Sequence, residues 1–553
     1  MHTHTEDNIR RKFIIHNIKV RLEHGKADGY DGLAFHRAEK ILRKSDFFRS
    51  AGKPRFEIYK KSVDARDRDA VLFVYTVAVS FEKGSCANTA LREKLLGICR
   101  RENITLSEND SFEIPQYRGL SRPVVCGFGP CGMFAALVLA RAGARPIVLE
   151  RGADADTRVK IVEHFWKTGE LSESTNVQFG EGGAGTFSDG KLLTRINDPL
   201  CSYVLETFAA HGASPDILVN AKPHVGTDKL RNIVKSIRRE IISLGGEVRF
   251  CTELTSLEFC ADGRNVKIGV NGNAPELITD ALFLAPGHSA RNTFAMLAES
   301  RIEMCAKPFS VGVRIEHLQK DIDTALYGNF AGHPALSPGE YALSCRCGGR
   351  AAYTFCMCPG GTVVASASEN GTIVTNGMSY STRSGTNANC AVAVSVSTDD
   401  FAASPFAAME FQAEIERRAF GIAGGNGSAP IQTVGGFFGR TNGKPTTVTP
   451  TYTGNVAVCS MTDVFPKFVT DTLEFGLCNF DKKVKGFASD SAVLTAPETR
   501  TSSPVKLPRG EDRRAVGHYC VYTCGEGAGY AGGITSAAVD GMRSALAFLA
   551  NES

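Results

Sequence analysis

Residues 124–152 read Val124-Val-Cys-Gly-Phe-Gly-Pro-Cys-Gly-Met-Phe-Ala-Ala-Leu-Val-Leu-Ala-Arg-Ala-Gly-Ala-Arg-Pro-Ile-Val-Leu-Glu-Arg-Gly152. The pattern predicts a strand, a glycine turn, a helix and a second strand with an acidic end. Gly127 permits the tight turn, Gly129 leaves room for a pyrophosphate, and Gly132 lets the helix pack on the strand. Glu150 follows Gly132 by 18 positions (150 − 132), where a carboxylate can hold a ribose hydroxyl. We therefore predict a dinucleotide site; the alternative is a glycine-rich turn that binds no ligand.

The composition is that of a globular protein. The chain has 553 residues, 43% hydrophobic and 22% charged, with a net charge of +4 that gives no case for a nucleic-acid partner. The N-terminus lacks the order of a signal peptide, and no apolar run approaches the ~20 residues that span a bilayer. The 17 cysteines are expected to be free thiols. We expect a soluble cytoplasmic protein without a membrane partner.

The N-terminal region is expected to be a separate domain. Residues 13–22 predict a strand, residues 31–42 a helix, and two further strands and a helix at Thr89–Cys99 follow. The order β-α-β-β-α predicts a ferredoxin-like α+β domain over residues 1–100. This domain is a candidate binding module for a protein partner.

Three later glycine-rich stretches accompany the first turn. Residues 176–191 hold five glycines, which indicate either a cofactor wall or a mobile lid. A buried strand ends in Leu284-Ala-Pro-Gly287, and Thr523-Cys-Gly-Glu-Gly-Ala-Gly529 joins a strand to the last helix. The N-terminus of that helix predicts a second anion site.

In this order the turns resemble the FAD-binding flavoproteins of the glutathione-reductase-like superfamily, whose "ATG" and "GD" motifs correspond to Leu284-Ala-Pro-Gly287 and to the last glycine turn. Glu526 stands where the superfamily usually has Asp, and the resemblance implies that Glu526 contacts the ribitol or a phosphate. Further motifs make the chain similar to uncharacterised bacterial FAD-dependent dehydrogenases with a small N-terminal α+β domain. They are Gln178-Phe-Gly-Glu-Gly-Gly-Ala-Gly-Thr-Phe-Ser-Asp-Gly-Lys-Leu, Gly312-Val-Arg-Ile-Glu-His, Tyr353-Thr-Phe-Cys-Met-Cys-Pro-Gly-Gly, Asn376-Gly-Met-Ser, Glu498-Thr-Arg-Thr-Ser-Ser-Pro and Cys524-Gly-Glu-Gly-Ala-Gly-Tyr-Ala-Gly-Gly.

The resemblance implies an α/β fold with bound FAD and leaves the substrate open. We expect a discontinuous Rossmann-like FAD-binding domain over 120–300 and 511–553, with a mixed α+β substrate domain inserted at 301–510. Cys131 stands where the family usually has a smaller residue such as Ala. The expected cofactor-binding residues are Gly127, Gly129, Pro130, Cys131, Gly132, Glu150, Arg151, Gly183, Gly185, Thr186, Lys191, Gly287, Gly525, Glu526, Gly532, Gly533 and Ile534.

A flavin performs the redox chemistry, so the candidate catalytic residues are those expected beside it. Cys356 and Cys358 fall on one face of an expected strand and can exchange electrons with a disulfide, or they are simply two buried thiols. Lys191 can polarise the flavin or cap a turn.

Two arginines and two histidines complete the set of candidates. Arg314 or Arg500 can bind an acidic substrate group, or each forms an ion pair, Arg314 with Glu316 and Arg500 with Glu498. His317 belongs to the same charged run as Arg314. His288 can donate a proton or lie under the cofactor.

These residues predict an FAD-dependent oxidoreductase that transfers a hydride to or from flavin N5 with a small, unidentified substrate. The alternatives are a non-catalytic flavoprotein or redox sensor, and a thiol–disulfide reductase that uses Cys356 and Cys358. Only one G-x-G-x-x-G turn has its acid, so NAD(P)H, as a candidate electron donor, would bind transiently at the flavin face. No cysteine or histidine spacing predicts a metal site.

Overall fold

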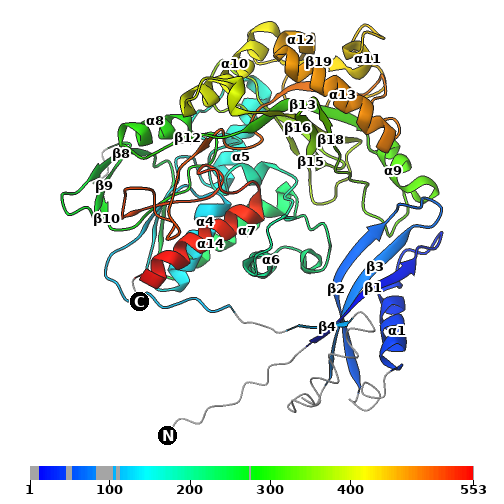
Figure 1. Cartoon of the computed structure of the whole chain (residues 1–553), viewed down its shortest axis with the longest axis horizontal. Coiled ribbons are helices and arrows are strands. Elements are labelled where there is room, and N and C mark those ends of the chain that lie inside the picture. The colour runs from blue at the N-terminus through cyan, green and yellow to red at the C-terminus, as the bar shows by residue number, and fades with distance from the viewer. Residues whose placement is uncertain (1–11, 45–52, 82–103, 108–111, 273–275, 552–553) are drawn as a thin grey trace. The chain divides into compact units, whose positions relative to one another are not determined.

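The computed structural model describes residues 12–44, 53–81, 104–107, 112–272 and 276–551. The chain divides into two compact units (Figure 1). The first consists of Met1–Glu113 together with Ser214–Pro223 and Leu326–Ser337, and the second of the remaining residues. No sequence signal indicated that these two later segments belong with the N-terminal region.

The first unit contains one antiparallel sheet in the order β2-β3-β1-β4. Its elements are β1 (Lys12–Arg21), α1 (Tyr30–Leu42), β2 (Pro54–Asp64), β3 (Leu72–Phe81) and β4 (Ile104–Ser107). Apolar side chains of β1, α1 and β3 form its core. The sheet extends past the predicted boundary at residue 100, because β4 pairs with β1. The predicted helix Thr89–Cys99 lies outside the described residues, so the ferredoxin-like arrangement stays a prediction.

The second unit is built on a parallel sheet in the order β23-β11-β5-β6-β7. The strands are β5 (Val124–Cys126), β6 (Ile147–Leu149), β7 (Glu247–Arg249), β11 (Leu282–Leu284) and β23 (Val521–Thr523). All but β7 are fully buried, as expected for a sheet covered on both faces. Since the strands are parallel, the glycine turns after β5, β11 and β23 meet at one edge of the sheet.

Helices α4 (Pro130–Arg141) and α14 (Ile534–Asn551) pack side by side on this sheet (Figure 1). Their approach is close because α14 presents Gly541, where a Cβ atom would clash with the carbonyl of Cys131. The other helices of this part are α5 (Ala155–Thr168), α6 (Leu200–Ala210), α7 (Thr227–Ser243) and α8 (Arg291–Glu299). The C-terminal strand and helix thus complete the nucleotide-binding sheet.

A larger mixed sheet follows in the order β14-β15-β18-β13-β21-β19-β20. Its strands are β13 (Phe309–Leu318), β14 (Ser344–Cys347), β15 (Arg350–Cys358), β18 (Asn387–Val396), β19 (Ala429–Thr433), β20 (Val456–Val458) and β21 (Val493–Glu498). The helices along this segment are α9 (Gln319–Tyr327), α10 (Pro405–Ile422), α11 (Val434–Phe437), α12 (Met461–Val464) and α13 (Lys467–Lys483). The remaining strands form three small sheets. The first contains β8 (Leu254–Phe259), β9 (Val266–Val270) and β10 (Leu277–Thr279). The second pairs β12 (Cys305–Ala306) with β22 (Val505–Lys506), and the third pairs β16 (Thr362–Ala365) with β17 (Thr375–Met378).

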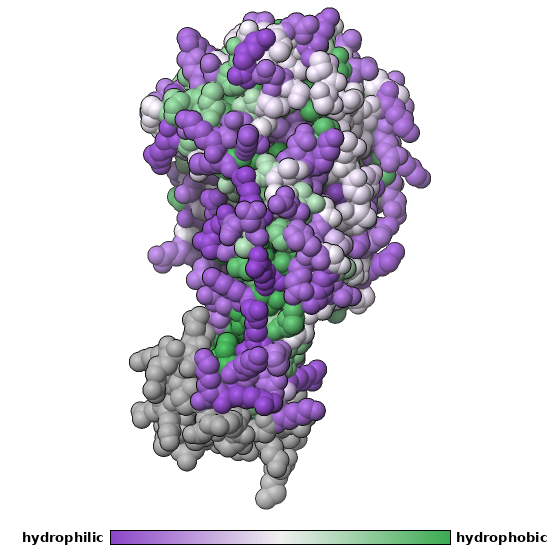
Figure 2. All heavy atoms as spheres, turned by 90° about the vertical axis from the view of Figure 1, so that its right-hand side faces the viewer, coloured by the Kyte–Doolittle hydropathy of each residue, from purple (hydrophilic) through white to green (hydrophobic). Residues whose placement is uncertain are grey.

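The face of the molecule in Figure 2 is mainly hydrophilic, with smaller hydrophobic areas between polar ones. Across the described ranges, no helix combines the length and the apolar character needed to cross a bilayer.

Candidate functional site

A cavity of about 310 Å³ opens in the second unit at the edge where the glycine turns meet. This volume lies in the range of small-molecule sites. Most of the predicted site residues line it, namely Gly127, Gly129, Pro130, Cys131, Glu150, Arg151, Gly183, Gly185, Lys191, Gly287, Cys356, Arg500, Glu526, Gly532, Gly533 and Ile534. The predicted residues outside its lining are Gly132, Thr186, Arg314, His317, Cys358 and Gly525.

The first glycine turn is shaped by close backbone contacts. Gly127 has a φ of +98°, and a Cβ atom there would clash with the carbonyl of Ala285. A Cβ atom at Gly132 would clash with the carbonyl of Gly127, so the helix can approach the turn only with glycine here. At Gly129 a Cβ atom would meet nothing closer than the Cα of Gly183 at 3.7 Å. Gly127 and Gly132 therefore allow close contacts between backbone segments, whereas Gly129 keeps space open at the cavity.

Two helix N-termini lie at the cavity. Helix α4 starts at Pro130 with no acidic residue in its first turn. Helix α14 starts at Ile534, directly after Gly532 and Gly533, and all three residues line the cavity. Free N–H groups and the positive dipole ends of two helices make this region suited to an anion such as a diphosphate.

Glu150 joins two loops of the site. Its Oε1 accepts hydrogen bonds from the backbone N–H of Gly152 and of Gly180, both at 2.9 Å. Its Oε2 accepts one from the N–H of Phe128 at 2.8 Å. Because a carboxylate has about four acceptor positions, Oε2 retains one for a hydroxyl group. The neighbouring Arg151 forms an ion pair with Glu253.

Arg158, which no sequence pattern indicated, organises the glycine-rich loop. Its side chain is fully buried, and its guanidinium donates to five backbone carbonyls at 2.8–3.2 Å. The acceptors are Asn176, Val177, Gly180, Glu181 and Gly183. Burial lowers the pKa of Arg158 to about 10. A loop fixed in this way forms a wall of the cavity. This favours a cofactor wall, and not a mobile lid, as the role of residues 176–191.

Lys191 belongs to a charged cluster at the cavity. Its Nζ lies 3.0 Å from Asp189 Oδ2 and 3.0 Å from Glu340 Oε2. Asp189 is fully buried and also accepts from Arg383 Nε at 3.0 Å. Burial alone would lower the pKa of Lys191, but the two carboxylates outweigh it and raise this pKa. An ammonium group has three N–H donors, so Lys191 keeps one beyond these two pairs.

Arg314 and His317 are structural in this fold. Arg314 has no exposed surface and pairs with Glu498, not with Glu316, the ion-pair partner that the sequence offered as the alternative to substrate binding. Glu316 instead accepts from Asn387 and Thr451. His317 is 4% exposed, and its Nε2 lies 2.7 Å from the carbonyl oxygen of Phe487. Neither residue lines the cavity, so a catalytic role for them has no geometric support.

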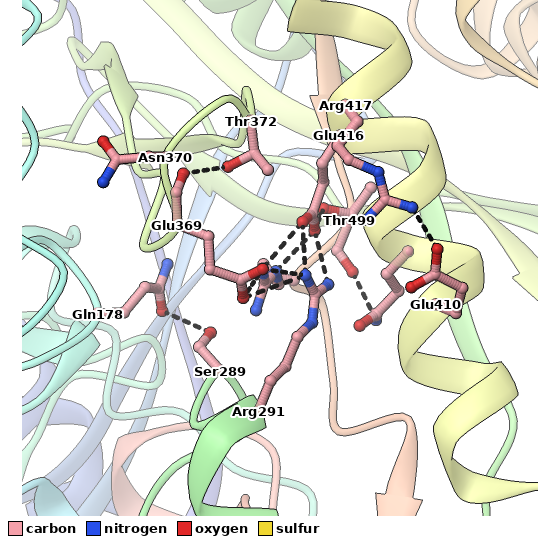
Figure 3. Close-up of polar contacts among 12 residues, drawn as sticks. Gln178, Ser289, Arg291, Glu369, Asn370, Thr372, Glu410, Glu416, Arg417 and Thr499 are labelled. Carbon is pink, nitrogen blue, oxygen red and sulfur yellow. Dashed lines mark hydrogen bonds and ion pairs between the residues drawn. The ribbon is translucent and has the colours of Figure 1, made fainter. Parts of the chain in front are cut away.

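Arg500 also forms an ion pair, but with partners other than Glu498, which the sequence offered as the alternative to substrate binding. Its Nε donates to Glu416 Oε1 at 2.7 Å, and its Nη2 donates to Glu416 Oε2 at 2.9 Å and to Glu369 at 3.3 Å. Figure 3 shows Arg291 reaching the same two carboxylates from α8. Nη1 of Arg500 is buried without a hydrogen bond to any described residue. Arg500 lines the cavity with its charge already compensated.

His288 and Glu526 both line the cavity, with Nε2 and Oε1 4.0 Å apart. Burial, followed by the charges of Arg500 and Arg291, lowers the pKa of His288 to about 3, so the imidazole is neutral. Burial raises the pKa of Glu526 to about 7, against the opposing charge of Lys307. Near pH 7 a neutral imidazole therefore faces a carboxyl group that is about half ionised. Throughout the described part of the chain, no group of His, Cys, Asp or Glu side chains has the arrangement of a metal site.

Comparison with known proteins gives a family for this chain. Residues 308–501 match a family model described as "FAD-dependent protein, C-terminal domain-like". An uncharacterised protein of Clostridium beijerinckii is 46% identical over 493 residues, which cover 88% of this chain and 91% of that protein.

Solved structures are more distant. CtdE in complex with FAD has a TM-score of 0.30 and 10% identity, over 77% of this chain and 83% of that chain. Thioredoxin reductase of Lactococcus lactis has a TM-score of 0.17 and 18% identity, over 30% of this chain and 36% of that chain. Scores this low carry no argument, so the assignment rests on the sequence matches. The chain belongs to the same family as the Clostridium beijerinckii protein, and its cofactor is FAD.

Proposed function

We propose that the protein is an FAD-dependent oxidoreductase that exchanges a hydride with a small substrate. The observation that carries this proposal is the composition of one cavity. The cavity has the glycine turn and Glu150 in its lining, and also Phe355 and Cys356 of β15 and Asn376 of β17. Bound FAD supplies the hydride chemistry, while the protein positions it and excludes water.

The residues of the cavity fit the cofactor. The N-termini of α4 and α14 suit the diphosphate, and Gly129 leaves space beside it. Oε2 of Glu150 has an acceptor position for a hydroxyl of the adenosine ribose. Glu526 has no hydrogen bond to another described side chain and suits the ribitol or a phosphate. Gly525 does not line the cavity itself. It makes room for Cys131, which does, because a Cβ atom at Gly525 would lie 2.7 Å from Cys131 Cβ.

An acidic substrate fits the cations of the cavity lining. Lys191 retains one N–H donor, and Nη1 of Arg500 lacks an acceptor among the described residues. A carboxylate or phosphate that reaches either group would satisfy a donor that is otherwise left without a partner.

The flavin of the purified protein tests the proposal. We expect a yellow protein whose flavin is bleached, under anaerobic conditions, by NADH, by NADPH or by a member of a panel of small acids. A protein that neither contains FAD nor binds added FAD would contradict the core of the proposal. A flavin that no reductant of the panel bleaches would favour the non-catalytic alternative, in which the first unit serves as an interaction module for a protein partner.

A second candidate function is thiol–disulfide reduction by Cys356 and Cys358. Sγ of Cys358 donates to the backbone carbonyl oxygen of Cys356 at 3.3 Å, and Cys356 lines the cavity. In this function the two thiols would become a disulfide as an acceptor is reduced. Free thiols are counted in the oxidised and in the anaerobically reduced protein; an unchanged count would eliminate this candidate.

A further inference from the structure

The cavity of the second unit opens to solvent beside two apolar side chains. Among the described residues that line it, the exposed ones are Leu193, Phe355, Gly532 and Gly533. Leu193 is 60% exposed and Phe355 is 38% exposed. The two glycines bring no side chain to the opening, so one aliphatic and one aromatic side chain remain there. Small-molecule sites are lined mainly by such side chains, with a few polar groups that orient the ligand.

The backbone that leads into Leu193 is anchored at two points. In the first turn of α14, Thr535 Oγ1 donates to the carbonyl oxygen of Leu192 at 2.7 Å. Lys191 forms an isolated antiparallel bridge with His224. The side chain of Leu192 is buried, whereas that of Leu193 is left at the cavity and in contact with solvent. The exposure of Leu193 is therefore a consequence of the packing on both sides of this segment.

Phe355 lies at the cavity because strand β15 bulges. Phe355 and Cys358 pair with residues of β18 that are only two positions apart, so β15 uses three steps where β18 uses two. Cys356, inside the bulge, has a φ of +45°. Successive side chains of a regular strand point to opposite faces, yet Phe355 and Cys356 both line the cavity. A bulge re-aims side chains in this way.

Lys191 supplies a cation at the same cavity. Its side chain is 30% exposed, and its ion pairs with Asp189 and Glu340 engage two of its three N–H donors. The remaining donor suits one oxygen of a carboxylate, whereas a phosphate group presents three oxygens. Arg500 also lines the cavity, but its Nη1 atom, which has no acceptor among the described residues, is buried. Lys191 is therefore the cation that is open to a ligand entering from solvent.

We propose that the substrate is a small carboxylic acid with an apolar body. Its carboxylate pairs with Lys191, and its body packs against Leu193 and Phe355. Removal of apolar surface from water stabilises the second contact, while the charge pair orients the ligand. These three side chains would select the substrate of the proposed FAD-dependent reaction, so this proposal rests on the proposed function.

Calorimetric titration of the FAD-loaded protein with acetate, butyrate and hexanoate tests the substrate class. Each added CH₂ group that becomes buried should tighten binding about fourfold, which corresponds to about 0.8 kcal/mol. Hexanamide has the same chain without the charge and should bind at least about tenfold more weakly than hexanoate. Affinities that do not depend on chain length, or that are equal for hexanoate and hexanamide, would overturn the proposal.

Substitutions at the opening test the apolar contact. In Leu193→Ser and in Phe355→Ser, the gain in affinity from acetate to hexanoate should shrink at least about threefold, while the preference for hexanoate over hexanamide stays. Ile278→Ser and Phe406→Ser are the matched controls, because both residues are exposed and lie outside the cavity lining. A gain as large in the Leu193 and Phe355 variants as in the controls would place the apolar contact elsewhere and overturn the proposal.

Substitution of Lys191 tests the charge pair. Lys191→Met should lose the preference for hexanoate over hexanamide and keep the dependence on chain length; an unchanged preference in the folded variant would overturn the proposal. If this variant does not fold, because Asp189 and Glu340 lose a partner, the comparison of the two ligands on the wild-type protein still decides. A yellow protein that binds no acid of the series overturns the substrate class alone, whereas a colourless protein that binds no added FAD contradicts the proposed function itself.

Discussion

Arg314 and Glu498 form a two-pronged ion pair in the interior of the large sheet, with Nε 3.1 Å from Oε2 and Nη2 3.0 Å from Oε1. Arg314 lies on β13 and Glu498 ends the neighbouring strand β21. Gly377 makes room for the pair, because a Cβ atom there would lie 2.6 Å from Nη1 of Arg314. The same guanidinium holds the carbonyl of Cys356. One buried contact therefore connects the sheet to the cavity.

Replacing Arg314 should cost stability. Arg314→Ala leaves the Glu498 carboxylate buried without its partner, and such losses amount to about 3–5 kcal/mol. Denaturant unfolding of the FAD-loaded protein measures the change. Arg418→Ala is the matched control, because Arg418 and Glu414 form an exposed pair on α10 that is worth about 0.3–0.5 kcal/mol. Similar losses in both variants would show that the buried pair has no special role.

Substitution of Gly129 should weaken the binding of the cofactor without disturbing the fold. In Gly129→Ala the new methyl group meets Gly183 Cα at 3.7 Å, an ordinary contact, and the backbone there suits alanine. We expect normal folding, with a dissociation constant for FAD raised about tenfold, or about 1.4 kcal/mol. Fluorescence titration of the FAD-stripped protein checks this. Gly421→Ala, at an open position on α10, should change neither property; unaltered FAD affinity in Gly129→Ala would place the cofactor elsewhere.

Glu150→Gln should weaken both the loops and the cofactor site. Both carboxylate oxygens accept backbone N–H groups, and an amide turns one of these acceptors into a donor. Loss of one buried hydrogen bond costs about 1–3 kcal/mol. The thermal midpoint should therefore fall even without FAD, and FAD affinity should fall as well. Glu206→Gln, exposed on α6, is the comparison. A midpoint equal to that of the wild type would mean that Glu150 does not hold the loops.

The sequence predicted those parts of the site that depend on local backbone geometry. Gly127 has a φ of +98°, and a Cβ atom at Gly132 would clash with the carbonyl of Gly127, so residues close in the sequence determine the turn. The later turns were found in the same way, and the parallel sheet brings them together. Cys356 was singled out by its motif, but the bulge that separates it from Cys358 depends on pairing with β18.

The contacts between distant segments were beyond prediction. Arg314 and Glu498 are 184 positions apart, whereas the ion-pair partner that the sequence offered, Glu316, lies two positions away on the same strand. Arg158 lies in an amphipathic helix, where a single arginine usually faces solvent. Its five carbonyl acceptors become visible only once the glycine-rich loop is folded around it.

Glu526 predicts a pH dependence of stability for the FAD-free protein. Its side chain is 28% exposed, and burial raises its pKa to about 7, whereas an unfolded chain has a glutamate pKa of about 4.3. Between these values the folded state holds a proton that the unfolded state has lost, so stability falls as pH rises through this window. Above pH 7 both states are ionised and the full penalty is present.

Glu526→Gln removes that penalty, because the amide does not ionise. The thermal midpoint of the FAD-free variant should match the wild type near pH 4.5 and exceed it increasingly up to pH 8. Glu163→Gln, exposed on α5, should show no such trend. Lys307 is the charged neighbour that opposes the shift, so Lys307→Met should steepen the loss of stability in the wild-type background. A difference between Glu526→Gln and wild type that is constant across this pH range would assign Glu526 an ordinary pKa and an ionised state at the cavity.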